Sequence, residues 1–188
     1  MSVRLLLATR NAHKVREFER LLPGLELDPL PDDVPTPPET GTTYAGNALI
    51  KARAAAEATG RAAIADDSGV EAEALGGRPG VRSARFAGAD ASDGENLAKL
   101  RREVPPGSRL EYVCVIAHVA ADGDETLFYG RCAGTMAAEG AGARGFGYDP
   151  VFVPDGDRRT MAELGDDEKD AISHRALAAR ALLAWLVA

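Results

Sequence analysis

Two adjacent carboxylates follow a short apolar run near the middle of the chain, in the segment Ala65-Asp66-Asp67-Ser68-Gly69. The run at 62–65 predicts a short central strand, and the ligands of open α/β sheets gather beyond the carboxyl ends of strands. Paired carboxylates there suit Mg²⁺, which takes one or two of them beside waters and phosphates, or one could accept a proton from an attacking water. Neighbouring side chains of an extended segment point to opposite faces, so Asp66 and Asp67 need not both face a site. The structural alternative is an acidic turn that Gly69 closes.

A second polar segment, Thr9-Arg10-Asn11-Ala12-His13-Lys14, lies between a predicted strand and a predicted helix. Backbone N–H groups at a helix N-terminus bind anions, and the helix dipole strengthens the site. Thr9 and Asn11 add neutral donors and Lys14 adds a positive charge, although the glycines of a Walker A motif are missing. The alternative is that Asn11 only caps the helix and Lys14 is a solvated lysine.

Glu39 follows a proline-rich loop and precedes a predicted helix at 44–59. A carboxylate at this position could complete a metal shell with the aspartates. It could also do no more than stabilise the helix N-terminus electrostatically.

A glycine-rich loop contains the segment Gly145-Phe146-Gly147-Tyr148-Asp149-Pro150. An aromatic ring held between two glycines can stack on a base, an interaction worth roughly 1–3 kcal/mol. Asp149 can accept a hydrogen bond from a ring N–H or from a neighbouring amide. The alternative is a turn with a buried Phe and Tyr.

Near the C-terminus, the segment Lys169-Asp170-Ala171-Ile172-Ser173-His174-Arg175 begins the last predicted helix. Ser173 is a plausible cap, which places His174 and Arg175 in the first turn, where the helix dipole disfavours positive charge. Donors to a purine carbonyl or to phosphates would explain them. The alternative is a solvated helix start.

These segments need elements to position them, and the hydrophobic pattern supplies strands and helices in a mixed order. Helices are expected after the Asn11 cap and the Ser92/Glu95 and Thr160/Glu163 capping boxes, at 44–59, and at the C-terminus. Strands are expected at 3–9, 25–30, 62–65, 70–74, 110–120, 125–135 and 151–153. The pattern predicts an α/β fold with no domain boundary, that is, a single domain over 1–188.

Composition excludes several classes of function. The 188-residue chain has a net charge of −7, which argues against a broad nucleic-acid surface, and no apolar window approaches the ~20 residues that span a bilayer. No Cys/His zinc spacing and no nucleophile elbow is present. Two cysteines, Cys114 and Cys132, flank a predicted hairpin turn and are expected to be buried reduced thiols rather than a disulfide. We therefore expect a cytoplasmic protein without a membrane or nucleic-acid partner.

Seven segments, taken in order, resemble the inosine/xanthosine triphosphate pyrophosphatase family, also called Ham1-like. They are Leu7-Ala8-Thr9-Arg10-Asn11 with Lys14, Glu39-Thr40-Gly41, Asn47-Ala48 with Lys51-Ala52, Ile64-Ala65-Asp66-Asp67-Ser68-Gly69, Pro79-Gly80-Val81 with Ser83-Ala84-Arg85, Phe146-Gly147-Tyr148-Asp149-Pro150, and Ile172-Ser173-His174-Arg175. Each is weak alone, but seven in sequence over nearly the whole chain form a specific match.

The resemblance implies hydrolysis of ITP, dITP and XTP to the monophosphate and pyrophosphate with Mg²⁺, which keeps deaminated purines out of DNA and RNA. It also implies a homodimer and an elongated mixed central sheet flanked by helices, with two lobes and the active-site cleft between them. By resemblance, Asp67 is catalytic and binds metal with Glu39. The implied substrate-binding residues are Thr9, Arg10, Asn11, Ala12, His13, Lys14, Ser68, Phe146, Gly147, Tyr148, Asp149, Lys169, His174 and Arg175.

The chain departs from the family pattern at two positions. Many members have Gly where Arg10 stands, so the phosphate loop is expected to be stiffer or to carry an extra cation. Many have Glu where Gly46 stands, and its loss places more weight on Glu39 and Asp67 as metal ligands.

Two other functions fit the sequence less well. A pyrophosphatase for modified nucleotides of the Maf-like group would show a different opening motif from the one at 9–14. A nucleotide-binding regulatory module without turnover would not need the carboxylates of Glu39, Asp66 and Asp67.

Overall fold

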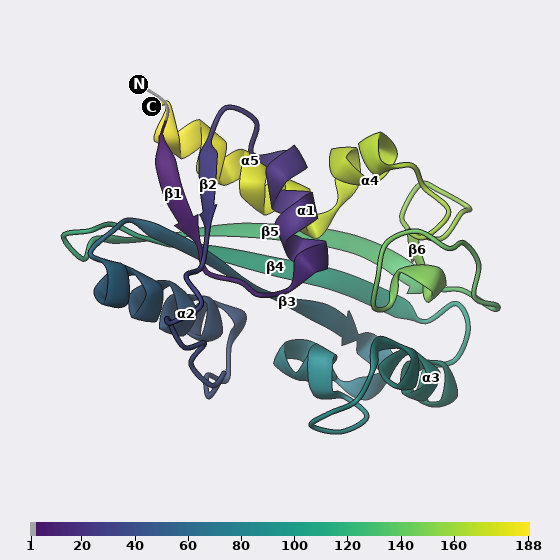
Figure 1. Ribbon diagram of the computed structural model, residues 1–188. Helices are drawn as coiled ribbons and strands as arrows, with labels where there is room; N and C mark the ends of the chain where they lie inside the picture. The colour runs from purple at the N-terminus through teal and green to yellow at the C-terminus, as the bar shows by residue number, and fades with distance from the viewer. Residues whose placement is uncertain (1–2) are drawn as a thin grey trace. The chain divides into compact units, whose positions relative to one another are not determined.

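The computed structural model describes residues 3–188 and contains one mixed six-stranded sheet in the order β2-β1-β3-β4-β5-β6 (Figure 1). The strands are β1 Arg4–Leu7, β2 Glu26–Pro29, β3 Ala63–Ala72, β4 Arg109–Val119, β5 Glu125–Met136 and β6 Phe152–Pro154. β1 pairs in parallel with both β2 and β3, whereas β5 and β6 are antiparallel. The predicted α/β fold is confirmed.

Within residues 3–188, five α-helices accompany the sheet: α1 Ala12–Leu21, α2 Tyr44–Thr59, α3 Asp93–Glu103, α4 Asp166–Ile172 and α5 His174–Leu186. Local caps explain three of the helix starts. The Asn11 side chain accepts hydrogen bonds from the first-turn amides of α1, Thr43 caps α2, and the predicted Ser92/Glu95 capping box begins α3. Among residues 3–188, no helix has the length and apolar character to cross a membrane.

The chain divides into two compact units, and each has its own core. Of the described residues, unit 1 comprises 3–67, 114–130 and 176–188, and unit 2 comprises 68–113 and 131–175. In unit 1, Ala63 and Ala65 of β3 pack with the alanines of α2, whereas Ile64 packs with Phe18 of α1 and Leu182 of α5. β3 therefore sends alternate side chains to opposite faces, one covered by α2 and the other by α1 and α5 (Figure 1).

The core of unit 2 is a single cluster of buried side chains. It includes Val70 of β3, Leu100 of α3, Tyr112 of β4 and Phe152 of β6. The Phe152 and Tyr112 rings stack with centroids 4.3 Å apart. The cluster joins strand and helix residues of this unit, so it fixes the strand β4 from which Tyr112 projects.

The structure corrects two predicted elements. The acidic segment at 66–69 is not a turn: β3 continues through it to Ala72, which also merges the strands expected at 62–65 and 70–74. The Thr160/Glu163 capping box does not begin a helix. The Glu163 carboxylate does accept from the Thr160 amide at 2.7 Å, but residues 160–163 form only a turn, and α4 begins at Asp166.

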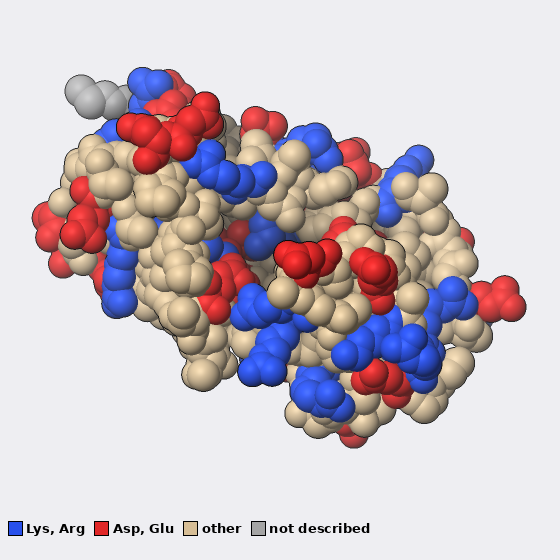
Figure 2. Space-filling view, turned by 60° about the horizontal axis from the view of Figure 1, so that its bottom comes forward, with Lys and Arg blue, Asp and Glu red and all other residues tan. Residues whose placement is uncertain are grey.

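Charged side chains of both signs intermingle on the face that Figure 2 presents. Lys and Arg lie among Asp and Glu there rather than forming a continuous basic surface. Both cysteines are free and buried, as expected.

Candidate active site

The alternation of β3 assigns its two aspartates to different helices. Asp67 shares the face of Ala63 and Ala65, and its Oδ2 accepts from Asn47 Nδ2 of α2 at 2.9 Å. Asp66 points to the other face, where Lys14 Nζ of α1 lies 2.9 Å from its Oδ2 and 3.0 Å from its Oδ1. The side chains diverge as predicted for an extended segment.

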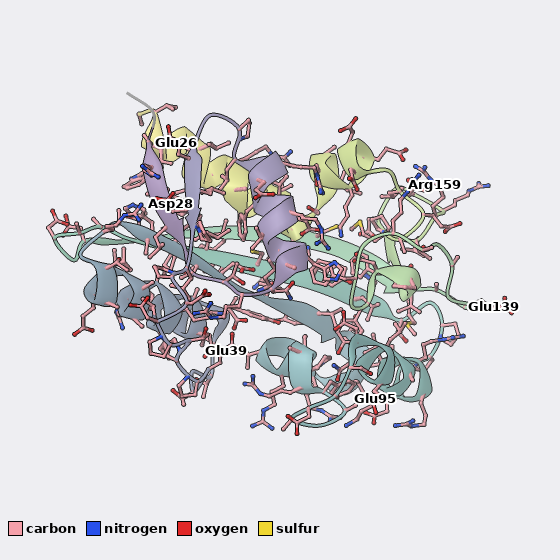
Figure 3. All side chains as sticks on the ribbon, viewed as in Figure 1. Glu26, Asp28, Glu39, Glu95, Glu139 and Arg159 are labelled. Atoms are coloured by element: carbon pink, nitrogen blue, oxygen red, sulfur yellow. The ribbon has the colours of Figure 1, made fainter. Side chains whose placement is uncertain are left out.

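Asp67 belongs to a buried charged group in unit 1. Burial raises the pKa of Asp67 to about 6; the lysine of α2, Lys51, lowers it, and Glu39 raises it again. Lys51 Nζ lies 2.5 Å from Glu39 Oε1, and Figure 3 labels Glu39 near α2. Burial lowers the pKa of Lys51, but the surrounding carboxylates raise it by more, so its net pKa lies above the ordinary value. Lys51 is therefore a charged side chain beside the two predicted metal ligands.

The donor set of Glu39 and Asp67 fits a hard divalent cation. Each carboxylate raises the energy of the other when both are ionised, and Glu39 contributes to the raised pKa of Asp67. A cation bound between the two ionised carboxylates would offset this electrostatic repulsion. Among the described residues, no three or more His, Cys, Asp or Glu side chains gather as a metal cluster. Mg²⁺ does not require one, since it takes one or two carboxylates and fills its shell with water and phosphate oxygens.

The predicted phosphate segment places its side chains in several directions. Asn11 Oδ1 accepts from the amides of His13 at 2.9 Å and Lys14 at 3.2 Å, so Asn11 acts as the helix cap. Thr9 Oγ1 accepts from the Asn11 amide at 3.2 Å, Ala12 is the first residue of α1, and His13 Nδ1 lies 2.9 Å from Arg16. Of the predicted segment, the side chain of Lys14 is the one that reaches the aspartates.

Arg10 contacts the proline-rich loop that precedes Glu39. Its Nη2 donates to the carbonyl oxygens of Pro31 at 2.9 Å and Val34 at 2.8 Å. These contacts support the stiffer loop rather than the extra cation, the two consequences that were expected of Arg10.

Unit 2 holds the predicted base-recognition residues around Asp149. This carboxylate is 3% exposed, and its Oδ2 accepts from Lys169 Nζ at 2.7 Å and from the Phe146 amide at 3.0 Å. Of the two donors predicted for Asp149, the neighbouring amide is therefore present. Lys169 Nζ and Arg175 Cζ lie 5.4 and 5.7 Å from the centre of the Phe146 ring. Two cationic side chains thus lie close to the Phe146 ring.

Other residues of the predicted set also have partners within unit 2. Arg175, 2% exposed, donates from Nη2 to Ser68 Oγ at 2.8 Å, and His174 stacks on a tyrosine. The Gly147 amide donates to Asp93 Oδ2 at 3.1 Å, and the buried Tyr148 hydroxyl donates to the carbonyl of Ser83 at 2.7 Å. Gly147 and Tyr148 therefore have contacts that shape the loop.

Gly69 is required for close packing behind the aspartates. A Cβ at this position would overlap the carbonyl oxygen of Gly80 and the hydroxyl of Ser83. Those atoms belong to the 3₁₀ segment Gly80–Arg85, and the Ser83 hydroxyl also accepts from the Val70 amide at 2.9 Å. The motif at 66–69 thus ends in glycine because another backbone lies against the strand.

No sequence motif assigns a role to Asn47, Lys51 or Tyr112. Asn47 and Lys51 stand four residues apart in α2 and are 0% and 8% exposed. Two polar side chains at this spacing within an alanine-rich helix lie on one face, and that signal could have identified them. Tyr112 lies in an apolar strand and gives no comparable signal.

Known proteins resemble this chain in both sequence and fold. A model of the Ham1 family matches residues 5–185. A dITP/XTP pyrophosphatase of Frankia alni is 47% identical, with 98% of this chain and 97% of the relative covered; one of Symbiobacterium thermophilum is 50% identical, with 93% and 90% covered. The structure of a HAM1 protein from Coxiella burnetii superposes with a TM-score of 0.87 at 40% identity, covering 98% of both chains, and that of the Staphylococcus aureus Ham1 protein with 0.85 at 37%, covering 97% of both. The chain belongs to the Ham1 family.

Proposed function

We propose that this protein hydrolyses the non-canonical purine nucleoside triphosphates ITP, dITP and XTP to the monophosphate and pyrophosphate. The observation that carries the proposal is the buried carboxylate of Asp67, whose pKa is raised to about 6 among Asn47, Lys51 and Glu39. A carboxylate with this pKa is largely ionised at neutral pH and can still accept a proton, as a general base must. Relatives covering almost the whole chain are named dITP/XTP pyrophosphatases.

Glu39 and Asp67 would hold Mg²⁺, with Asp66 nearby on the opposite face of β3 and paired with Lys14. When bound, the ion would neutralise charge on phosphate oxygens. Its presence would also stabilise the ionised form of Asp67, which the apo environment disfavours.

The chain's own residues have distinct tasks in the proposed reaction. Lys14 and Lys51 supply positive charge near the triphosphate, and Asp67 orients a water and takes its proton as the oxygen attacks phosphorus. The bond between that phosphorus and the bridging oxygen breaks, and pyrophosphate leaves with the bridging oxygen. Positioning and charge neutralisation therefore account for the rate more than covalent chemistry does.

The unit 2 set supplies base recognition. Hypoxanthine and xanthine carry a 6-oxo group where adenine has an amine, so the donors of Lys169, His174 and Arg175 favour the oxo form. The ring of Phe146 offers a stacking surface for the base. A buried donor left unpaired by the wrong base can discriminate by orders of magnitude. Guanine shares the oxo group and must be rejected around its 2-amino group.

The test is a substrate panel of ITP, dITP, XTP, GTP and ATP with Mg²⁺, in which the phosphate product is identified. We expect pyrophosphate from ITP, dITP and XTP far faster than from ATP or GTP. Chelation should stop turnover, and added Mg²⁺ should restore it. The Asp67→Asn variant, purified by the same procedure, controls for contaminating phosphatases. Release of orthophosphate, or equal rates on all five substrates, would contradict the proposal.

We further propose that the protein acts as a homodimer in the cytoplasm. Two free, buried cysteines suit a reducing compartment. Sedimentation equilibrium at micromolar concentration should return twice the mass of one chain, and the mass of a single chain would contradict the dimer.

A further inference from the structure

Tyr112 is a buried residue of β4 that connects two parts of the unit 2 set. It is 5% exposed, and its hydroxyl donates to Asp149 Oδ1 at 2.9 Å. Its ring also stacks on the imidazole of His174, with centroids 4.5 Å apart and planes inclined by 10°. One side chain therefore touches both the loop that carries Phe146 and the first residue of α5.

Each carboxylate oxygen of Asp149 accepts hydrogen bonds, and the donors to the two oxygens differ in kind. Oδ2 receives the ammonium of Lys169 and the amide of Phe146, and Oδ1 receives the Tyr112 hydroxyl. A buried carboxylate is costly unless hydrogen bonds satisfy it, so these donors hold its plane in one orientation. If the hydroxyl were lost, Oδ1 would lose this donor, and the carboxylate would be held through Oδ2 alone and could turn about that oxygen. Lys169 and the Phe146 backbone would move with it.

The ring of Tyr112 acts on His174 independently of the hydroxyl. Near-parallel stacking restricts the tilt of the imidazole, and Phe152 in turn packs against the Tyr112 ring. A phenylalanine at 112 would retain these ring contacts. The hydroxyl is therefore a separable feature, and packing alone does not explain it.

We propose that Tyr112 is a positioning residue that sets base selectivity, its hydroxyl fixing Asp149, and through it Lys169 and Phe146, while its ring fixes His174. The inference rests on the proposed function, because the selectivity in question is that of the triphosphate reaction. The contacts that carry the inference, to Asp149 and His174, lie within the base-recognition set of unit 2. Its effect is therefore on the choice of base rather than on the rate of bond breaking.

The decisive variant is Tyr112→Phe, assayed for kcat and KM with ITP and with ATP. We expect the ratio of kcat/KM for ITP over ATP to fall ~10-fold, the size expected for a hydrogen bond to a charged group. The loss should appear in the KM for ITP, because base contacts formed equally in ground and transition states change KM and leave kcat.

Thr160→Val is the matched control. Thr160 is 3% exposed, lies in unit 2, and its hydroxyl donates to the carbonyl of Ala141 at 2.8 Å. Each variant removes one buried hydroxyl, so both should lower the melting temperature by similar amounts. Only Tyr112→Phe should change the ratio. An equal fall of the ratio in both variants would reduce Tyr112 to a stability residue and overturn the inference.

A double-mutant cycle with Asp149→Asn tests whether Tyr112 acts through Asp149. The double variant should show the ratio of Asp149→Asn alone, because the hydroxyl has no further effect once its acceptor is altered. Additive losses would overturn the inference, as would a ratio within twofold of wild type in Tyr112→Phe. Calorimetric binding of IMP against AMP to the same proteins should show the same pattern without turnover.

These outcomes separate the inference from the proposed function. A wild-type protein that releases no pyrophosphate from ITP contradicts the proposed function, whatever Tyr112 does. A wild-type protein selective for ITP, together with an equally selective Tyr112→Phe variant, contradicts only the positioning role.

Discussion

Asp67 carries its charge where water reaches little of the side chain, which is 5% exposed. Sequence position and the family resemblance identified it as the central residue, and its burial confirms that it is not a solvated turn residue. The sequence could not identify the partners of the two aspartates. Alternation predicts that they diverge, but the contacts with Lys14 and Asn47 depend on which helix covers which face of β3.

Asp67→Asn should abolish pyrophosphate release and yet stabilise the metal-free fold at neutral pH. The folded-state pKa, about 6, lies above the ordinary value of 3.8. The stabilising contribution of the protonated group is therefore full below pH 4 and lost as pH rises through 6. An amide does not ionise, so the variant keeps its stability over this pH range. Its free energy of unfolding should therefore exceed that of the wild type by an amount that grows between pH 4 and 6 and reaches the order of 3 kcal/mol above pH 6.

The measurement is urea unfolding at several pH values with a chelator present, since bound cation would favour the ionised carboxylate. Asp66→Asn is the matched control: it removes the ion-pair partner of Lys14 at 2.9 Å and should destabilise the fold instead. A destabilised Asp67→Asn, or a gain that does not change with pH, would contradict the assignment.

The elements show where local signals are sufficient and where they are not. Asn11 and Ser92 begin their helices as predicted, because a cap is satisfied by amides one turn away. Asp, Ser and Gly favour turns, and the strands predicted at 62–65 and 70–74 leave a break at 66–69. Partners distant in the sequence override that preference, and β3 continues. The Thr160/Glu163 pair makes its capping contact without a helix, so the motif alone does not determine one.

The β5–β6 pairing depends on a glycine. Gly134 lies opposite Pro154, and a Cβ there would come within 2.7 Å of the buried Phe152 ring. Gly134→Ala should therefore cost about 1–3 kcal/mol of unfolding free energy through overpacking. Gly94→Ala in α3 meets no atom within 4 Å and should be neutral or add up to about 1 kcal/mol, as glycine is a poor helix former. Urea unfolding compares the two, and a neutral Gly134→Ala would contradict the packing at β6.

For the whole molecule, net charge predicts the class of partner better than it predicts the site. The value of −7 argued against a broad nucleic-acid surface but not against an anionic substrate. Lys14 and Lys51 lie beside carboxylates within unit 1, and Lys169 and Arg175 surround Phe146 within unit 2. The grouping of these cations depends on the tertiary structure, so the net charge of the chain does not predict it. The single predicted domain divides into two units, and the expected cleft between two lobes stays a prediction.

The two thiols provide a test of packing across the chain. Burial raises the pKa of Cys132 to about 11, and Cys114 is 0% exposed. Neither should react with a disulfide reagent at pH 8 in the native protein, whereas both should react in guanidinium. Tyr129→Cys, at a position 56% exposed, is the control and should add one fast-reacting thiol. Rapid reaction of either native cysteine would contradict the burial.

The alternation of β3 has a consequence for how this gene can change. Asp66 and Asp67 are the same amino acid, but each occupies a place defined by counting residues from the strand's start at Ala63. Deleting or inserting one codon between Ala63 and Asp66 would preserve both acids and exchange the faces to which they point. Such a frame-preserving indel should therefore be as damaging as losing a carboxylate, although an inventory of conserved residues would record no loss.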